Sequence, residues 1–409
     1  MKIWLLQSSE PMPVLNPNMR LLRTGMMAEK LVEKGHDVIW FNNSFDHFTK
    51  TQMVDKDTTV RVRENYTLYL PYAIKYKRNI SVSRIINHMI LAKKFKNKAK
   101  IMCKPDLIYA SFPTIDYAYE AVKYGKKNNV PVIIDIRDLW PDIFNHNLPK
   151  VLSIFASPYI KYMDIKTKYI MKNCFAINGT SDDILVWGLN KAGRSKKKYD
   201  RYFYIGYNNE KIKDNIKSEK NLIDNKKFNI SFFATINNQF NYNLIYELAT
   251  IMSKKDKDVI FNICGDGPQF NLLKEKVCNL DNVKLFGWTE KKDLQNILSN
   301  SKIGLAPYKD TFDFRMSVSN KFTEYLAYGL PVVITCEGNM KKILKNNNCG
   351  LGSQDINKIC KYILKLKKDL KRYKIESNNA KKLYEENFVA SKIYDNIVNY
   401  IEEIGDEIK

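Results

Sequence analysis

Short apolar runs that alternate with amphipathic helical patterns along the whole chain constrain its fold most strongly. Such runs are typical of parallel strands that are buried on both faces of a sheet and joined by helices. The sequence therefore predicts an α/β protein built from doubly wound, Rossmann-like domains. The predicted strands are 3–6, 38–41, 107–110, 132–134, 175–177, 202–205, 230–234, 259–264, 283–286, 303–306 and 332–334.

A polar stretch, NNEKIKDNIKSEKNLIDNKK, interrupts this pattern and is typical of a linker between domains. The length of 409 residues also favours two domains over one. We expect a first domain at 1–207, a linker at 208–227, a second domain at 228–388 and a C-terminal helix at 389–409 that returns to the first domain. Two such domains would face a central cleft, with ligands at the carboxyl ends of the strands.

Composition limits the classes of function. The seven cysteines include no C-x-x-C pair, which argues against a disulfide framework or zinc ribbon and favours a cytoplasmic location. No apolar stretch reaches the roughly 18 residues expected of a membrane span. The four histidines are not spaced as metal ligands, and the pair Asp256 and Asp258 precedes a predicted strand instead of following it. We therefore expect no metal site.

The net charge of +23 implies an acidic partner or an anionic surface. Residues 73–104 contain ten basic residues and no acidic one. The apolar residues of this segment recur at helical spacing, which predicts a basic amphipathic helix; they are Ile85, Met89, Ala92, Phe95 and Ala99. A solvated helix face and an anionic membrane surface both explain the segment. Nucleic acid is disfavoured, because its recognition motifs are missing.

A lysine in an unfavourable place marks the segment SNKFTEYLAYGLPVV, residues 319–333. The pattern predicts a helix closed by Gly329, with Lys321 in its first turn, where the helix dipole disfavours a cation. One explanation is a surface pair with Glu324, three residues on. The other is an anion bound at the start of the helix, with Glu324 accepting hydrogen bonds from the vicinal hydroxyls of a ribose.

Two further motifs follow predicted strands. CGDGPQF, residues 264–270, lacks the third glycine of a dinucleotide-binding fingerprint, so it is either a plain turn or a turn whose amides face a ligand. DIRDLWPDIF, residues 135–144, places several charges directly after a buried strand, which is unfavourable unless they are paired or used. Arg137 therefore either pairs with Asp135 or Asp138, or lines a cleft.

In that order, these segments resemble the retaining glycosyltransferases of the two-domain GT-B type, family 4, the bacterial group 1 enzymes that build O-antigens, capsules and other surface glycans. The resemblance covers nearly the whole chain. It implies a nucleotide-diphosphate-sugar donor bound mainly by the second domain, an acceptor bound mainly by the first, and no required metal or cofactor. It rests on KPDLIYASFP (104–113), DIRDLWPD (135–142), AINGTSDDI (176–184), ICGDGPQFNLLKEKV (263–277), DNVKLFGWTEKKDL (281–294) and SNKFTEYLAYGLPVV (319–333).

Carried over residue by residue, the resemblance implies that Glu324 binds the ribose and that Lys321, beside Asn320, contacts the diphosphate or sugar. Arg20 looks like a second cation for the diphosphate. The other implied donor-binding residues are Thr235, Gly265, Asp266, Gly267, Gly287, Trp288 and Arg315. Arg137, Asp138 and Trp140 are the candidate acceptor-binding residues, and Asp138 or His47 would orient or deprotonate the acceptor hydroxyl.

This sequence departs from the family pattern in two places. The first glutamate of the Glu-seven-Glu motif is replaced by Met316, which leaves Asp313 and Arg315 as nearby substitutes. The basic pair that many members carry after the first strand of the second domain is also missing, and Thr235, Asn237 and Asn238 stand there. More of the phosphate binding would then depend on Lys321, Arg315 and Arg20.

The predicted function is transfer of a sugar to a lipid-linked glycan acceptor at the inner face of the plasma membrane, with 73–104 near anionic head groups. No nucleic-acid partner is expected. The alternatives are a sugar-nucleotide epimerase or hydrolase of the same fold, and a non-catalytic basic protein that binds glycan or nucleic acid. The sequence identifies neither the base and sugar of the donor, nor the acceptor and linkage, nor the oligomeric state.

Overall fold

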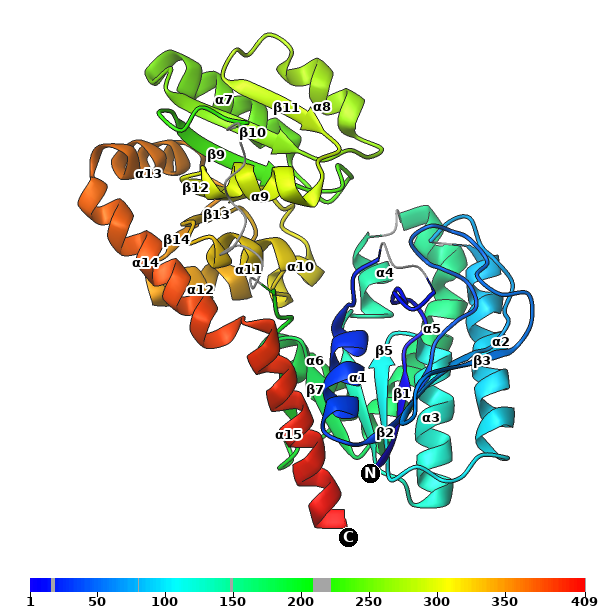
Figure 1. The fold of residues 1–409 in the computed structure, drawn as a ribbon. Coiled ribbons are helices and arrows are strands. Elements are labelled where there is room, and N and C mark those ends of the chain that lie inside the picture. The colour runs from blue at the N-terminus through cyan, green and yellow to red at the C-terminus, as the bar shows by residue number, and fades with distance from the viewer. Residues whose placement is uncertain (16–18, 80, 148–149, 209–221, 409) are drawn as a thin grey trace. The chain divides into compact units, whose positions relative to one another are not determined.

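A computed structural model describes residues 1–15, 19–79, 81–147, 150–208 and 222–408, and the predicted linker at 208–227 lies mostly outside these ranges. The chain divides into two compact units, Met1–Tyr204 with Lys392–Lys409, and Ile205–Ser391. Each unit is a sheet with helices packed on it (Figure 1). The prediction of an α/β protein with two parallel-sheet domains is confirmed.

The first unit has a sheet of eight strands in the order β3-β4-β2-β1-β5-β6-β7-β8, parallel except where β3 pairs with β4. Its strands are β1 (Lys2–Leu6), β2 (Asp37–Phe41), β3 (Thr58–Arg63), β4 (Tyr66–Leu70), β5 (Leu107–Phe112), β6 (Val132–Ile136), β7 (Ala176–Gly179) and β8 (Arg201–Tyr202). Its helices are α1 (Arg23–Glu33), α2 (Val82–Ala99), α3 (Ile115–Asn128), α4 (Asp142–Asn147), α5 (Lys150–Asn173) and α6 (Asp182–Ala192).

Helices cover both faces of this sheet because the chain winds outward from β1 in two directions. On one face α1 contacts α15 (Ala390–Ile408), where Lys34 pairs with Glu402 at 3.2 Å and Lys30 pairs with Asp395 at 3.3 Å. Helices α2, α3 and α5 pack together on the other face (Figure 1). The side chains of β1, β5 and β6 are almost entirely buried between these layers.

The second unit has a six-stranded parallel sheet in the order β11-β10-β9-β12-β13-β14. Its strands are β9 (Phe228–Phe233), β10 (Val259–Cys264), β11 (Val283–Gly287), β12 (Ile303–Ala306), β13 (Val332–Ile334) and β14 (Gly350–Gly352). Its helices are α7 (Tyr242–Lys255), α8 (Phe270–Val277), α9 (Lys291–Ser299), α10 (Phe312–Met316), α11 (Asn320–Ala327), α12 (Asn339–Asn347), α13 (Ile356–Lys368) and α14 (Leu370–Asn387).

Strands β3, β4 and β14 were not predicted from the sequence, and β8 was predicted too far along the chain. Strand β3 alternates polar and apolar residues because it is an exposed edge strand, and β4 pairs antiparallel with it. Strand β14 is only Gly350–Gly352, which offers no apolar run. The strand predicted at 202–205 proved to be Arg201–Tyr202. No helix in the described ranges is both long and apolar enough to cross a bilayer.

Candidate functional site

The order of strands in the second unit points to a candidate site at the carboxyl ends of β9 and β12. The chain proceeds from β9 to β10 and β11 on one side, and β12 returns to pair with the other side of β9. The connections that leave β9 and β12 therefore diverge at this point, and ligands of open α/β sheets bind at such a switch point. The segments that meet there are the loop after β9 and the segment that leads from β12 to α11.

Helix α11 is held close to β12 and β9 by Tyr325. This side chain is fully buried, and its hydroxyl donates a hydrogen bond to the Leu305 carbonyl at 3.0 Å and accepts one from the Phe233 amide at 3.4 Å. The close approach requires Gly304, because a Cβ at that position would lie 2.3 Å from the Tyr325 ring. The position of α11 therefore follows from strand residues as well as from its own sequence.

The start of α11 matches the sequence prediction. Ser319 caps the helix by accepting a hydrogen bond from the Phe322 amide at 3.3 Å, and Gly329 follows its end at a φ of +66°. The remaining N–H groups of the first turn have no acceptor within the helix itself. Lys321 lies in this first turn, so its ammonium and the helix dipole combine to favour an anion.

Lys321 is half-buried against aromatic rings. Its Nζ lies 5.2 Å from the centre of the Phe240 ring and 5.8 Å from that of Phe233. Burial lowers its pKa to about 8, and the charge of Glu324 only partly opposes this shift. Within the described ranges no carboxylate lies close enough to form an ion pair with Lys321, so the surface pair with Glu324 is not formed.

Glu324 is half-buried on the same helix and lies against Tyr207. Burial first, and then the charge and hydrogen bond of Glu324, raise the pKa of the Tyr207 phenol. Tyr328 also lies near the Glu324 carboxylate. Burial, and then the charge of this carboxylate, raises the pKa of the Tyr328 phenol. An ionised carboxylate accepts several hydrogen bonds, which is the chemistry that binding the two hydroxyls of a diol requires.

The predicted glycine-rich turn lies beside the loop that follows β9. The Ile236 amide donates to the Asp266 carbonyl at 2.9 Å, and the Gly265 amide donates to the Gly287 carbonyl at 2.6 Å. Gly265 has a φ of +130°, and a Cβ there would come within 1.8 Å of the Ala234 carbonyl oxygen. Glycine is therefore required for the two loops to touch, and the structure brings Thr235, Gly265–267 and Gly287 into neighbouring segments.

The remaining predicted donor residues differ in their surroundings. Trp288 is 80% exposed, and Asn320 and Arg20 are exposed as well. Arg315 forms a two-pronged ion pair with Asp310, at 2.8 and 2.7 Å, so part of its charge is already neutralised. Asp313 is half-buried, and its Oδ1 is buried without a hydrogen-bond partner among the described residues.

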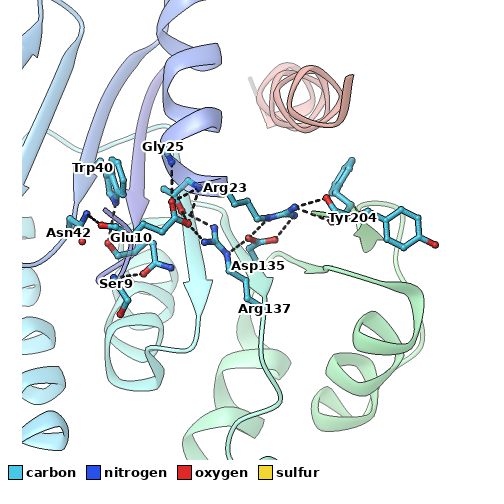
Figure 2. A network of polar contacts seen from close by, with 12 residues as sticks. Ser9, Glu10, Arg23, Gly25, Trp40, Asn42, Asp135, Arg137 and Tyr204 are labelled. Atoms are coloured by element: carbon cyan, nitrogen blue, oxygen red, sulfur yellow. Dashed lines mark hydrogen bonds and ion pairs between the residues drawn. The ribbon is translucent and has the colours of Figure 1, made fainter. Parts of the chain in front are cut away.

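In the first unit, a network of buried charges uses Arg137. Its Nε donates to Asp135 at 2.8 Å, its Nη2 donates to the Thr24 hydroxyl at 2.8 Å, and its Nη1 pairs with Glu10 (Figure 2). Arg23 binds the same Asp135 carboxylate at 2.9 and 3.0 Å. All three nitrogens of Arg137 are engaged within the protein, so the structure favours the pairing alternative over binding of an acceptor.

Glu10 anchors this network to the start of α1. Its carboxylate accepts hydrogen bonds from the amides of Thr24, at 2.9 and 3.0 Å, and Gly25, at 3.2 Å (Figure 2). The loop after β1 thus supplies its own anion to this helix terminus. Burial alone would raise the pKa of Asp135, but the charges of Arg23 and Arg137 outweigh it and lower the pKa to about 2.

The other predicted residues of the first unit gather around Arg84. The Arg84 guanidinium lies 5.0 Å from the Trp140 ring, and the Asp138 charge acts on it. His47 shares a hydrogen bond of 2.7 Å with the Tyr76 hydroxyl. Burial, followed by the charges of Lys50 and Arg84, lowers the pKa of His47 to about 4, so it is neutral at pH 7.

Several site residues were not recognised from the sequence. Phe233, Phe240 and Tyr207 lie against Lys321 or Glu324, but nothing in their local patterns distinguishes them from core aromatics. Arg84 was counted only among the charges of 73–104. The sequence did contain one indication that Arg84 lacks an ion-pair partner on its own helix. No acidic residue lies at helical spacing from it within 73–104. The described ranges contain no group of three or more residues able to hold a metal ion.

The comparisons with known proteins agree with this architecture. Residues 227–369 match the family model described as "Glycosyl transferases group 1". A search of curated proteins gives no match.

Three solved structures illustrate the likeness of the whole chain. HepE of Anabaena in complex with UDP is 13% identical, with a TM-score of 0.67, over 98% of this chain and 100% of that chain. The α,α-trehalose 6-phosphate synthase of Burkholderia multivorans is 11% identical, with a TM-score of 0.71, over 100% and 99%. WaaG, a glycosyltransferase involved in lipopolysaccharide biosynthesis, is 13% identical, with a TM-score of 0.64, over 98% and 99%. The chain thus has the two-domain fold of GT-B glycosyltransferases, and its second unit matches the group 1 domain.

Proposed function

We propose that this protein is a retaining glycosyltransferase of family 4 that transfers a sugar from a nucleotide-diphosphate-sugar to a lipid-linked glycan in bacterial surface polysaccharide synthesis. The observation that carries the proposal is the placement of Lys321. A half-buried cation without an ion-pair partner in the described ranges lies at the start of a helix and at the switch point of a parallel sheet. Each of these features favours a bound anion.

The proposed roles in the second unit follow from this placement. Lys321 and the start of α11 bind the diphosphate, Glu324 binds the ribose, and the segments around Gly265–267 and Gly287 line the nucleotide. Breaking the bond to the anomeric carbon leaves negative charge on the diphosphate, which a fixed cation and helix terminus stabilise. UDP is the first nucleotide to test, because the similar HepE structure contains it.

Asp313 is the proposed substitute for the glutamate that Met316 replaces. Its buried Oδ1 has no hydrogen-bond partner among the described residues, and buried polar atoms of native proteins are normally satisfied. A hydroxyl of the donor sugar would supply the missing hydrogen bond. In the first unit, Asp138 and His47 are proposed to orient the acceptor hydroxyl, beside Trp140.

Transfer activity tests the proposal. A panel of nucleotide sugars is screened for thermal stabilisation, and the stabilising donor is then assayed with lipid-linked acceptors. Lys321→Ala and Glu324→Ala are expected to abolish transfer while the melting temperature stays near that of the parent protein. Lys302→Ala, at the amino end of β12, is the matched control and should retain activity. Full activity in both site variants would refute the site, and release of free sugar or an epimer without acceptor would favour a hydrolase or epimerase.

We further propose peripheral attachment to the inner face of the plasma membrane through α2. Lys93 is exposed on this helix, whereas Lys94 pairs with Asp57 and Lys96 lies 3.9 Å from Glu120. Met89 departs from the predicted pattern, since it is 52% exposed instead of packed in the core. An exposed apolar side chain on a basic helix suits an interfacial position.

Vesicle sedimentation tests this attachment. Binding to anionic vesicles is expected at low salt, and it should weaken at about 0.5 M salt because the charges are screened. Replacing Lys93, Lys94 and Lys96 with glutamine should weaken it as well. The control replaces Lys361, Lys365 and Lys368 on α13, which removes the same charge from the other unit. A protein that stays in the supernatant at low salt, or a control that behaves like the α2 variant, would contradict attachment through α2.

A further inference from the structure

The first unit contains an apolar pocket formed by α2, α4, α5 and the segment before α4. Its volume is about 340 Å³, and its walls are mostly hydrocarbon. The apolar lining includes Val82 and Ile85 of α2, Phe144 of α4, and Ile160 and Met163 of α5. Pockets of this size with few polar groups are typical of sites for small apolar ligands.

Among the described residues that line this pocket, Arg84 is the one with a charged side chain. It lies 5.0 Å from the centre of the Trp140 ring and 5.8 Å from that of Tyr76. Its Nη1 donates to the Asn79 carbonyl at 2.7 Å, and its Nε is buried with no hydrogen-bond partner among the described residues. A half-buried guanidinium that has no carboxylate partner in the described part of the chain is a favourable binding group for an oxyanion.

A second cation, Lys50, lies beside Arg84. The Lys50 ammonium donates to the Asn79 side-chain oxygen at 2.6 Å and lies 4.9 Å from the centre of the Tyr76 ring. In the described part of the chain, neither Lys50 nor Arg84 has a carboxylate within ion-pair distance. Burial, and then the charge of the nearby Arg84, lowers the pKa of Lys50.

The neighbouring ionisable groups leave this positive charge largely uncompensated. Burial, then the charges of Arg84 and His47, lowers the pKa of His88 in the pocket wall to about 3, so this side chain is neutral at pH 7. Asp46 accepts hydrogen bonds from the Phe48 and Thr49 amides, at 2.7 and 3.0 Å. Asp138 accepts one from the Leu139 amide at 2.8 Å. In the described part of the chain neither carboxylate forms an ion pair with Arg84 or Lys50, so a bound anion would stabilise these two cations.

The rim of the pocket is apolar and exposed. Val82 of α2 lines the pocket and is 71% exposed, and Phe155 of α5, one helical turn before the lining residue Tyr159, is 80% exposed. Large apolar side chains at this exposure are unfavourable in water when they are grouped around one opening. They would instead be stabilised beside a hydrocarbon chain that leaves the pocket.

We propose that this pocket binds a phosphate or diphosphate together with the first part of the hydrocarbon chain that carries it. The anion would lie at Arg84 and Lys50, and the chain would lie between α2 and α5 toward Val82 and Phe155. The inference rests on the proposed function and deepens it, because it assigns the lipid end of the acceptor to this pocket. The occupant is the lipid phosphate of the acceptor, and not a phospholipid of the membrane.

Binding of dodecyl phosphate, below its micelle concentration, tests the inference. Dodecanol and inorganic phosphate test the chain and the anion separately, and vesicles containing phosphatidylglycerol test the membrane alternative. Arg84→Met should weaken dodecyl phosphate binding at least about 10-fold. The matched control is Arg61→Met, because Arg61 is exposed in the same unit and also donates to a backbone carbonyl, that of Glu64. Ala156→Phe, which narrows the pocket, provides a second variant if Arg84→Met does not fold.

Weaker binding by Arg84→Met, or by Ala156→Phe if Arg84→Met does not fold, with parental binding by Arg61→Met, would support the pocket. Equal binding of dodecanol or of inorganic phosphate alone, or equal binding by parent and Arg84→Met, would overturn it. Loss of vesicle binding alongside unchanged dodecyl phosphate binding in Arg84→Met would assign Arg84 to the membrane surface and also overturn it. UDP binding by the same proteins distinguishes failure of the pocket proposal from failure of the proposed function. Retained UDP binding without dodecyl phosphate binding contradicts only the pocket.

Discussion

At the scale of single residues, the charges after β6 have a structural role. Asp135 is fully buried between two arginines, and Glu10 completes the network at the start of α1 (Figure 2). The sequence indicated that charges so close to a buried strand had to be either paired or used in a cleft. It did not identify the partners Glu10 and Arg23, because they belong to another part of the chain and meet Asp135 only in the folded sheet.

Asp135→Asn is therefore expected to destabilise the first unit by about 3–5 kcal/mol, because it leaves two buried arginines with too little negative charge. Thermal unfolding, followed for the transition of this unit, measures the loss. Asp37→Asn is the control, since Asp37 is exposed and should change stability by less than about 0.5 kcal/mol. Equal stability of the two variants would contradict the structural role.

The stability of the same network depends on pH in a defined direction. The pKa of Asp135 is depressed from its ordinary value of 3.8 to about 2 in the folded protein. Its contribution is therefore fully present above about pH 4 and is lost as the pH falls through about 2. Asp135→Asn should remove this acid dependence from the unfolding of the first unit.

At the scale of elements, much of the site could be predicted because it is local. The start, the end and the lysine of α11 follow from capping residues and from helix electrostatics, which act within one turn. Strands with continuous apolar runs were also found. Strand β3 was missed because an exposed edge strand alternates polar and apolar residues and has no such run, whereas its partner β4 is mostly buried.

The contact between the loops after β9 and β10 predicts how replacing Gly265 affects stability. Gly265→Ala should destabilise the second unit by about 3 kcal/mol or more, since its Cβ would overlap the Ala234 carbonyl oxygen, 1.8 Å away, at a φ of +130°. Gly287→Ala is the matched control, because it also has a positive φ, +65°, but no atom lies within 4 Å of the added Cβ. Gly287→Ala should lower the free energy of unfolding by only about 1–2 kcal/mol. Thermal unfolding of both variants gives the comparison, and equal losses would contradict the importance of the loop contact.

At the scale of the whole molecule, the sequence predicted two parallel-sheet domains but not the order of their strands. Strand order depends on which helices pack on which face, and a list of strands along the chain does not contain that information. The order places Lys321 beside Phe233 and Phe240, which precede it by about 80 residues. The aromatic surroundings of Lys321, and with them its lowered pKa, could therefore be found only in the folded structure.

Lys321 is the group that we propose binds the diphosphate. Because burial lowers its pKa to about 8, the ammonium is charged below this pH, and binding of an anion above it requires uptake of a proton. The affinity of the protein for UDP should therefore fall as the pH rises beyond about 8. Lys321→Met should bind UDP about 10-fold or more weakly than the parent at pH 7, and its affinity should not fall further as the pH rises.

Calorimetric titration of UDP from pH 7 to 9.5 is the most direct measurement. The parent protein and Lys302→Met are compared with Lys321→Met. Lys302 is the matched control because its Nζ also lies near an aromatic ring, 5.9 Å from the centre of Tyr373, but at the amino end of β12. We expect tight, pH-dependent binding by the parent and the control, and weak, pH-independent binding by Lys321→Met. Equal affinity and equal pH dependence in all three proteins would contradict the proposed role of Lys321.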